Sequence, residues 1–249
     1  MSTTVRSSIR GMAVRANPAF AGGVVAVSLV ALAYTFTGVP IEHHTYVHVM
    51  TGLLWTGIDI FLGAVIGPVV GGLDEEVSAD VFRRLTPKTT FLLPSLALVT
   101  IATGITLAQR AVAFPHAEPW LALFTAANLI PALLLIAWRL EAWRDWRWQA
   151  LFAVAAVGSL SWVALTVGDL AMTNPAIVGA LAIVTVLSVQ GFGFLLPGEI
   201  RMYLEMISEN PDDGVISSIG KQNAMLGGVQ GLFQLVLIAD MVYLRYGGL

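Results

Sequence analysis

Residues 42–71 read EHHTYVHVMTGLLWTGIDIFLGAVIGPVVG and combine a membrane-length apolar run with several polar residues. At about 1.5 Å per residue, a helix of this length crosses the roughly 30 Å hydrocarbon core of a bilayer. The stretch carries His43, His44 and His48, three of the four histidines, and the acidic residue Asp59. Polar groups are costly inside lipid, so they usually have partners and often have a function. We therefore expect this stretch to be central to the fold and to any site.

The composition indicates a polytopic α-helical membrane protein. Of the 249 residues, 57% are hydrophobic and 12% are charged, whereas about a quarter of a soluble domain is charged. The apolar runs are continuous, unlike the short alternating segments of a membrane β-barrel. The absence of cysteine excludes disulfides, thiolate metal sites and thiol catalysis.

The apolar runs predict an all-α bundle of seven transmembrane helices that forms one integral membrane domain over residues 1–249. A polar tail at 1–17 precedes the first run, which is too long for a typical signal peptide and is expected to be retained. Pro94 and Pro131 are expected to kink their helices, and Pro87 is expected to end a helix over 73–85. The predicted spans are about 18–39, 47–70, 91–108, 119–138, 150–168, 176–196 and 224–243.

The distribution of positive charge predicts the orientation. Seven spans place the tail, 71–90, 139–149 and 197–223 on one side of the membrane, and these segments hold eleven of the 13 lysines and arginines. Such an excess marks the cytoplasmic side. The N-terminus is therefore predicted to be cytoplasmic and the C-terminus outside, in the cytoplasmic membrane of a prokaryote.

Residues 138–148 alternate tryptophan and arginine. Interleaved aromatic and basic residues can bind nucleic acid. At the cytoplasmic ends of two spans, however, they are typical of an interfacial belt whose arginines reach lipid headgroups. The sequence therefore favours the lipid bilayer as the partner and predicts no nucleic acid.

Glycines four residues apart predict which helices pack closely. Gly63, Gly67 and Gly71 have this spacing in the second span, as do Gly227 and Gly231 in the seventh. Small residues at this spacing let helix backbones approach one another. The second and seventh helices are expected at the centre of the bundle.

The histidines are the candidate metal ligands. His44 and His48 share one face if the second helix extends outward, and His116 is predicted in another outer loop. This spacing suits two ligands of one metal ion, and imidazole with thioether sulfur favours Cu(I). Met50, Met172 and Met241 are predicted near the same membrane face. Ordinary packing of histidine and methionine at an interface stays an open alternative.

Further polar residues are predicted inside the spans. Asp59 lies on the face below His48, roughly 16 Å along the helix. It is expected near the middle of the membrane, either functional or hydrogen-bonded across helices. The other intramembrane polar candidates are Asp240, Gln190, Gln230 and Gln234.

The pattern His48-x6-Trp55-x-Gly57, followed by a charged connection and a span with Thr103-Gly104, resembles the first helical pair of the copper resistance D (CopD) superfamily. That grouping is also similar to the HemJ-type membrane haem proteins. The resemblance covers about residues 44–108 and implies a helical bundle in which a histidine near the outer face binds copper or haem b. His48 is the residue that it assigns as the ligand.

These observations lead to a metal- or haem-binding membrane protein, with copper binding or uptake at the outer face as the leading hypothesis. One alternative is a haem b protein, held through His48, that exchanges electrons with quinone. Another is an accessory subunit of a larger respiratory or transport complex, with other subunits or a second copy as partners. A proton-coupled carrier centred on Asp59 is a further alternative. Whether the chain is an enzyme stays open.

Overall fold

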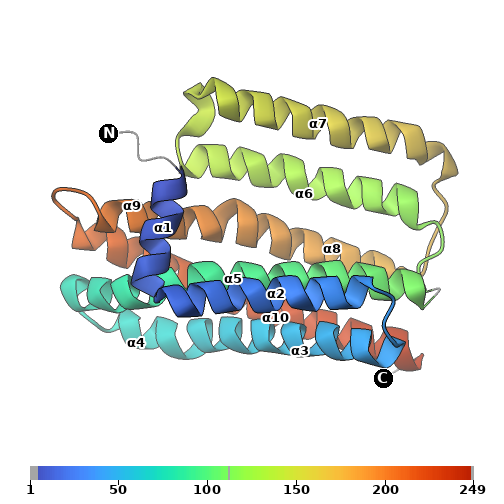
Figure 1. Cartoon of the computed structure of the whole chain (residues 1–249), viewed down its shortest axis with the longest axis horizontal. Helices are drawn as coiled ribbons and strands as arrows, with labels where there is room; N and C mark the ends of the chain where they lie inside the picture. Colours follow the sequence, from blue (N-terminus) through green and yellow to red (C-terminus); the bar gives the residue numbers. More distant parts are fainter. Residues whose placement is uncertain (1–4, 112, 248–249) are drawn as a thin grey trace. The chain divides into compact units, whose positions relative to one another are not determined.

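The computed structural model describes residues 5–111 and 113–247, and the described residues form helices and their connections without a strand (Figure 1). The all-α prediction is therefore confirmed. In chain order the helices are α1 (Val5–Ala16), α2 (Pro18–Phe36), α3 (Ile41–Phe61), η1 (Leu62–Ile66), α4 (Gly67–Gly71), α5 (Glu75–Arg110), α6 (Ala117–Arg139), η2 (Ala142–Arg144), α7 (Trp146–Thr166), η3 (Val167–Asp169), α8 (Pro175–Gln190), η4 (Gly191–Leu195), α9 (Leu196–Met206) and α10 (Asp213–Tyr246).

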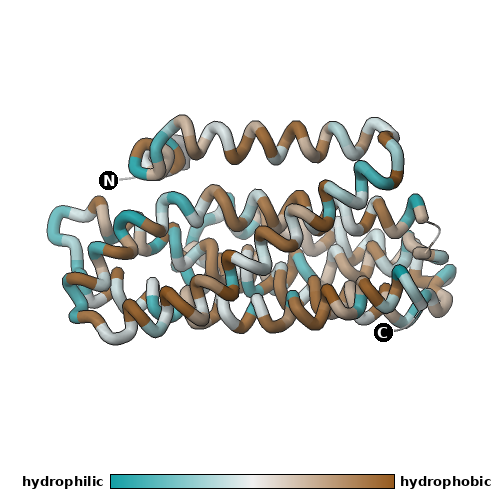
Figure 2. Tube along the Cα trace, turned by 90° about the horizontal axis from the view of Figure 1, so that it is seen from below, coloured by the Kyte–Doolittle hydropathy of each residue, from teal (hydrophilic) through white to brown (hydrophobic). Residues whose placement is uncertain are grey.

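Within the described residues, seven helical segments are long and apolar enough to cross a membrane, which confirms the predicted number. Each overlaps one predicted span, although several extend well beyond it. Figure 2 shows hydrophobic residues along the lengths of the helices and hydrophilic residues gathered near helix ends and connections. The segments are Pro18–Phe36, Ile41–Gly71, Glu75–Arg110, Ala117–Arg139, Trp146–Asp169, Pro175–Met206 and Asp213–Tyr246.

The chain divides into two compact units. Unit 1 comprises residues 1–104 and 198–231, and unit 2 comprises 105–197 and 232–249. Unit 1 contains α1 to α4, most of α5 and the first half of α10. Unit 2 contains α6, α7 and α8. The prediction of a single domain stays a prediction, and each unit is described by itself.

Glycine packing joins α3 to α10 in unit 1, as the glycine spacing predicts. A Cβ atom on Gly63 would lie 2.1 Å from the Cα atom of Gly228, and one on Gly231 would lie 2.6 Å from the Ile60 side chain. Only glycine lets the two backbones come this close. Gly71 takes no part, because it ends α4 and a Cβ atom there would meet nothing.

One end of unit 1 has a hydrophobic core of its own. It consists of buried side chains from α4, α5, α9 and α10, including Phe82, Met202 and Ile216. At this end Arg83 forms ion pairs with Asp80 and Asp213. Because α5 has 36 residues, it is about 54 Å long and exceeds a hydrocarbon core of about 30 Å. This charged end is the part that can project from the bilayer.

Prolines lie inside continuous helices. Pro94 is inside α5 and Pro131 is inside α6, as predicted. Pro87 also lies inside α5, so the prediction that it ends a helix is wrong. Neighbouring helices can compensate for the amide that proline lacks, and Pro87 itself is almost fully buried among them.

Two short π-helices interrupt long helices, η1 after α3 and η4 after α8. Each is followed at the same spacing by a proline, Pro68 after η1 and Pro197 after η4. π-Helical turns are rare in proteins, and those that occur are often found at functional sites. The residues around η1 and η4 are therefore candidates for a functional role.

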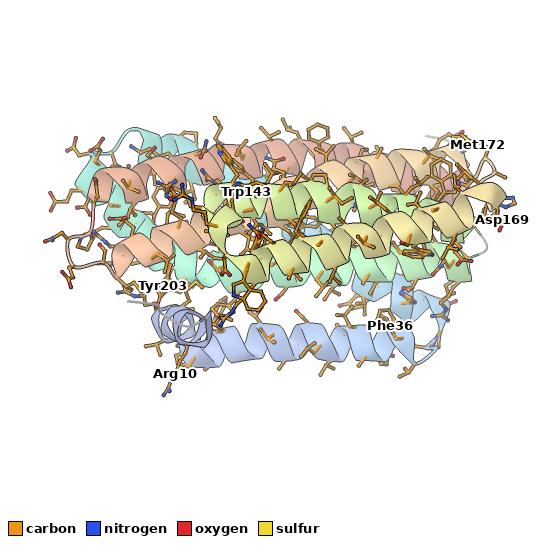
Figure 3. The ribbon with its side chains drawn as sticks, turned by 90° about the horizontal axis from the view of Figure 1, so that it is seen from above. Arg10, Phe36, Trp143, Asp169, Met172 and Tyr203 are labelled. Carbon is orange, nitrogen blue, oxygen red and sulfur yellow. The ribbon has the colours of Figure 1, made fainter. Side chains whose placement is uncertain are left out.

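The N-terminal tail contains a helix that the sequence analysis did not predict. In unit 1, α1 runs across the end of α2 rather than along it (Figure 1). A Cβ atom on Gly11 would lie 1.9 Å from the Tyr203 hydroxyl oxygen, so glycine allows α1 to pack against α9. Tyr203 lies beside α1 and Arg10 points outward (Figure 3).

Unit 2 is built on α6, which packs against α7 and α8. Gly193 of η4 lies against the backbone of Ala132, and the Arg139 guanidinium lies 4.0 Å from the centre of the Phe194 ring. Trp138, Trp143 and Trp146 are exposed at the α6–α7 connection (Figure 3 labels Trp143). Exposed tryptophans beside arginines fit the predicted lipid belt.

The α3–α10 contact makes a stability prediction. Gly63→Ala should destabilise the protein by about 1–3 kcal/mol, because the new methyl group would force apart two backbones in contact. Thermal unfolding in detergent measures the effect. Gly57→Ala in the same helix is the matched control, since a Cβ atom there would meet nothing within 4 Å. Equal melting temperatures for the two variants would contradict the close packing.

Candidate functional site

The histidine site lies at the start of α3. The helix begins at Ile41 after Pro40, so it extends outward past the predicted start of the span at 47. Residues four apart share a helix face, and both His44 and His48 reach the carbonyl groups of α5. The prediction that the two imidazoles share one face is therefore confirmed.

His44 is fully buried, with none of its surface exposed. Its Nε2 atom lies 3.0 Å from the carbonyl oxygen of Thr103. A carbonyl oxygen only accepts, so this geometry assigns the proton to Nε2. In this conformation a metal would have to be bound through Nδ1.

His48 has the complementary arrangement. Its Nδ1 atom lies 3.0 Å from the carbonyl oxygen of Thr100, so Nδ1–H is the donor and Nε2 carries the lone pair. Glycine at 104 makes room for the ring, because a Cβ atom there would lie 2.7 Å from the His48 Cε1 atom. The ring is therefore seated on the backbone of α5 in a defined tautomer.

Thr100 has an unsatisfied group next to this ring. Its carbonyl binds His48 and its methyl group faces Gly52, where a Cβ atom would lie 3.3 Å away. Its hydroxyl oxygen is buried and has no hydrogen-bond partner among the described residues. Buried polar atoms are normally satisfied by protein, water or a ligand. The residues around His48 thus include a buried polar atom that a bound group could satisfy.

Within unit 1, His43 does not join these two histidines, and His116 lies in the other unit. His43 is exposed and its Nδ1 atom lies 2.6 Å from the Tyr34 hydroxyl. His116 belongs to unit 2, where it is exposed with a left-handed backbone before α6. Among the described residues, no group of three or more histidine or acidic side chains is placed to hold a metal ion.

The methionines do not add thioether ligands to the pair. Met50 lies two positions after His48, on another face of α3, and is exposed. Met172 is 69% exposed in the loop after η3, in unit 2 (Figure 3). Within unit 1, the described residues therefore offer imidazole and not thioether sulfur at this end of α3 and α5.

Asp59 continues the inward face of α3 below His48, as predicted. It is 1% exposed, and a Cβ atom on Gly227 would lie 3.8 Å from its Oδ1 atom. Trp55, between His48 and Asp59, is also buried. The backbone of α10 thus covers the Asp59 carboxyl group at Gly227, the residue before the Gly228 that contacts Gly63.

The remaining polar candidates are divided between the units. Gln230 is buried in unit 1, and Gln234 is buried one turn further along α10. In unit 2, Gln190 is partly buried at the end of α8. Asp240 is also partly buried, and a Cβ atom on Gly179 would lie 3.9 Å from its carboxyl oxygens. Gln190 and Asp240 stay candidates without an assigned role.

Sequence reasoning did not single out the partly buried acid Glu199. It lies in α9, and the Thr89 hydroxyl donates a hydrogen bond of 2.7 Å to its Oε1 atom. The sequence analysis made no prediction for this residue. Its position two residues after Pro197, before a helix face of apolar residues, was the available signal.

Comparison with protein-family models, curated proteins and solved structures returned no match for this chain. The resemblance to the CopD superfamily therefore stays a prediction from the sequence. The functional argument rests on the geometry of the described residues.

The buried histidine makes a second stability prediction. His44→Ala should destabilise the fold by about 1–3 kcal/mol, because it removes a buried hydrogen bond and leaves a cavity between α3 and α5. His43→Ala, at the preceding and exposed position, should lower the stability much less. Chemical or thermal unfolding of both purified variants makes the comparison, and equal losses would contradict the structural role of His44.

Proposed function

We propose that the protein binds a metal centre through Nε2 of His48, at the ends of α3 and α5 that contain His44 and Thr103. The observation that carries this proposal is the hydrogen bond from His48 Nδ1–H to the Thr100 carbonyl. Metal-ligating histidines generally donate their second ring N–H to a carbonyl or carboxylate, which fixes the tautomer and orients the ring. The close packing of the His48 ring on Gly104 and the unpartnered Thr100 hydroxyl also support a ligand here.

Copper is the first candidate, as the sequence analysis favours. It is supported by the confirmed placement of two imidazoles on successive turns of one helix face. Imidazole is a suitable copper ligand. In this proposal His48 is the principal ligand and His44 is a second one through Nδ1, with copper as the bound or transported ion.

The iron of haem b is the second candidate. The fixed orientation of the His48 ring favours it, because a single histidine nitrogen is enough to hold haem iron from one side. When bound, haem would supply one-electron transfer, for example with a quinone. The chain's own part is to orient the His48 ring through Thr100 and to leave space at Gly104.

The orientation in the membrane belongs to the same proposal. The excess of lysine and arginine in the tail, 71–90, 139–149 and 197–223 supports a cytoplasmic N-terminus and an outer C-terminus. The His48 site then faces outward across the cytoplasmic membrane of a prokaryote. An ion or electron carrier on the outer side would have direct access to it.

The absence of cysteine makes the orientation easy to test. Single cysteines introduced as Asp169→Cys and Glu209→Cys would be the only thiols in the chain. Both positions are exposed. In intact cells a membrane-impermeant maleimide should label Cys at 169, and it should label 209 only after lysis. The reverse pattern would contradict the proposed orientation.

Metal content and visible spectra test the site itself. Purified protein should contain copper, or should show a haem Soret band with sharp α and β bands after dithionite reduction. His48→Ala should retain less than about a tenth of the bound metal. Loss of a residue that only orients a ligand already lowers metal affinity by about 10–100-fold. His43→Ala is the control and should retain it.

Gly104→Ala separates orientation from ligation at this site. The added methyl group should displace the His48 ring and weaken binding while leaving all histidines in place. Unchanged metal content in both His48→Ala and Gly104→Ala would contradict the proposal.

A further inference from the structure

Glu199 is a partly buried acid of unit 1 whose carboxyl group is hydrogen-bonded by threonine. Its Oε1 atom accepts a hydrogen bond from the Thr89 hydroxyl at 2.7 Å, and the Thr90 side chain is a second partner. All three residues come from α5 and α9, between the buried Phe82 cluster and the level of the histidines. Thr89 is buried, and Glu199 is partly buried against it.

No cation neutralises this carboxyl group among the described residues. The nearby positive side chains of the two helices, Arg84 and Lys88 on α5 and Arg201 on α9, are exposed. Lys88 instead donates to the carbonyl of Arg84. An isolated carboxylate is expensive to bury, and it is commonly neutralised by taking up a proton.

The threonines let the site hold either protonation state without moving heavy atoms. Thr89 Oγ1 also lies 3.1 Å from the carbonyl oxygen of Thr86. When Glu199 is ionised, the Thr89 hydroxyl donates to the carboxylate. When Glu199 is protonated, its O–H donates to Thr89, whose own proton turns to the Thr86 carbonyl.

Helix register places Asp59 at the same level. His48 of α3 binds Thr100 of the antiparallel α5. Asp59 lies 59 − 48 = 11 positions further along α3, and the matching position on α5 is 100 − 11 = 89, the threonine that binds Glu199. Gly227 of α10 covers Asp59. Extended along the two helices, this register places the buried Asp59 and the partly buried Glu199 in one layer, about 16 Å from His48.

We propose that Glu199 is a reversible proton-binding site, and that this layer with Asp59 gives the protein a proton-transfer function in addition to metal binding. The step is a simple acid–base reaction: a proton from water forms an O–H bond on the Glu199 carboxylate, and the same bond breaks on release. No electron moves and no other reactant is needed. The proposal stands independently of the metal at His48.

A hydrophobic carbodiimide tests the site in the full-length protein. N,N′-dicyclohexylcarbodiimide adds to protonated carboxyl groups in apolar surroundings, and mass spectrometry of peptides locates the adduct. Glu199 should be labelled at neutral pH, whereas the exposed Glu209 should not. Labelling should fall as the pH rises. Absence of labelling at Glu199 at every pH, or equal labelling of Glu209, would overturn the proposal.

Thr89→Val gives a second, isosteric test that leaves the Glu199 carboxyl group in place. Valine cannot donate to the carboxylate, so the ionised state loses a hydrogen bond and labelling should persist to higher pH, by about one pH unit. Thr51→Val, at a threonine that bonds only within α3, is the control and should leave the profile unchanged. An unshifted profile in Thr89→Val would contradict the threonine-assisted site.

Sodium competition distinguishes a proton from a metal cation. The two carboxyl oxygens of Glu199 and the hydroxyl oxygens of Thr89 and Thr90 are also the kind of ligands that bind a small cation. Addition of Na⁺ at constant pH should leave labelling of Glu199 unchanged if the site binds a proton. Protection by Na⁺ would overturn the assignment and identify a cation site instead.

Discussion

The contact between Gly63 of η1, which continues α3, and Gly228 of α10 is the constraint on which unit 1 depends. Lipid provides no hydrophobic driving force between helices, so close backbone packing must hold them together. With these two backbones touching, α3 has one fixed rotation about its axis. That rotation places Asp59 against Gly227 and turns His44 and His48 toward α5. The polar face of α3 is therefore positioned by a contact that contains no polar side chain.

The threonines of α5 give this helix a second role. Thr100 and Thr103 present carbonyl groups to the two histidines, and Thr86 and Thr89 serve Glu199. A helix carbonyl can accept a second hydrogen bond, and a threonine hydroxyl can both accept and donate. One helix thus supplies polar partners to α3 and α9 at two levels.

Much of the architecture could be predicted from the sequence, because long apolar runs and glycine spacing report local properties. The helix count, the shared face of His44 and His48, and the α3–α10 contact follow from periodicity alone. The helix through Pro87 could not be predicted, because buried neighbours decide whether a proline breaks a helix. The layer shared by Asp59 and Glu199 was missed because register between helices is a tertiary property.

The length of α5 means that one continuous helix is stabilised by two different solvents. Its far end packs in the cluster around Phe82 and Ile216, beside the ion pairs of Arg83, where water drives apolar side chains together. Its other end is held by small residues and imidazole–carbonyl bonds among helices in a hydrocarbon environment. Urea should therefore loosen the Phe82 end while sparing the histidine end, and a harsh detergent should act in the opposite order. The protein would then unfold from either end of the same helix according to the solvent.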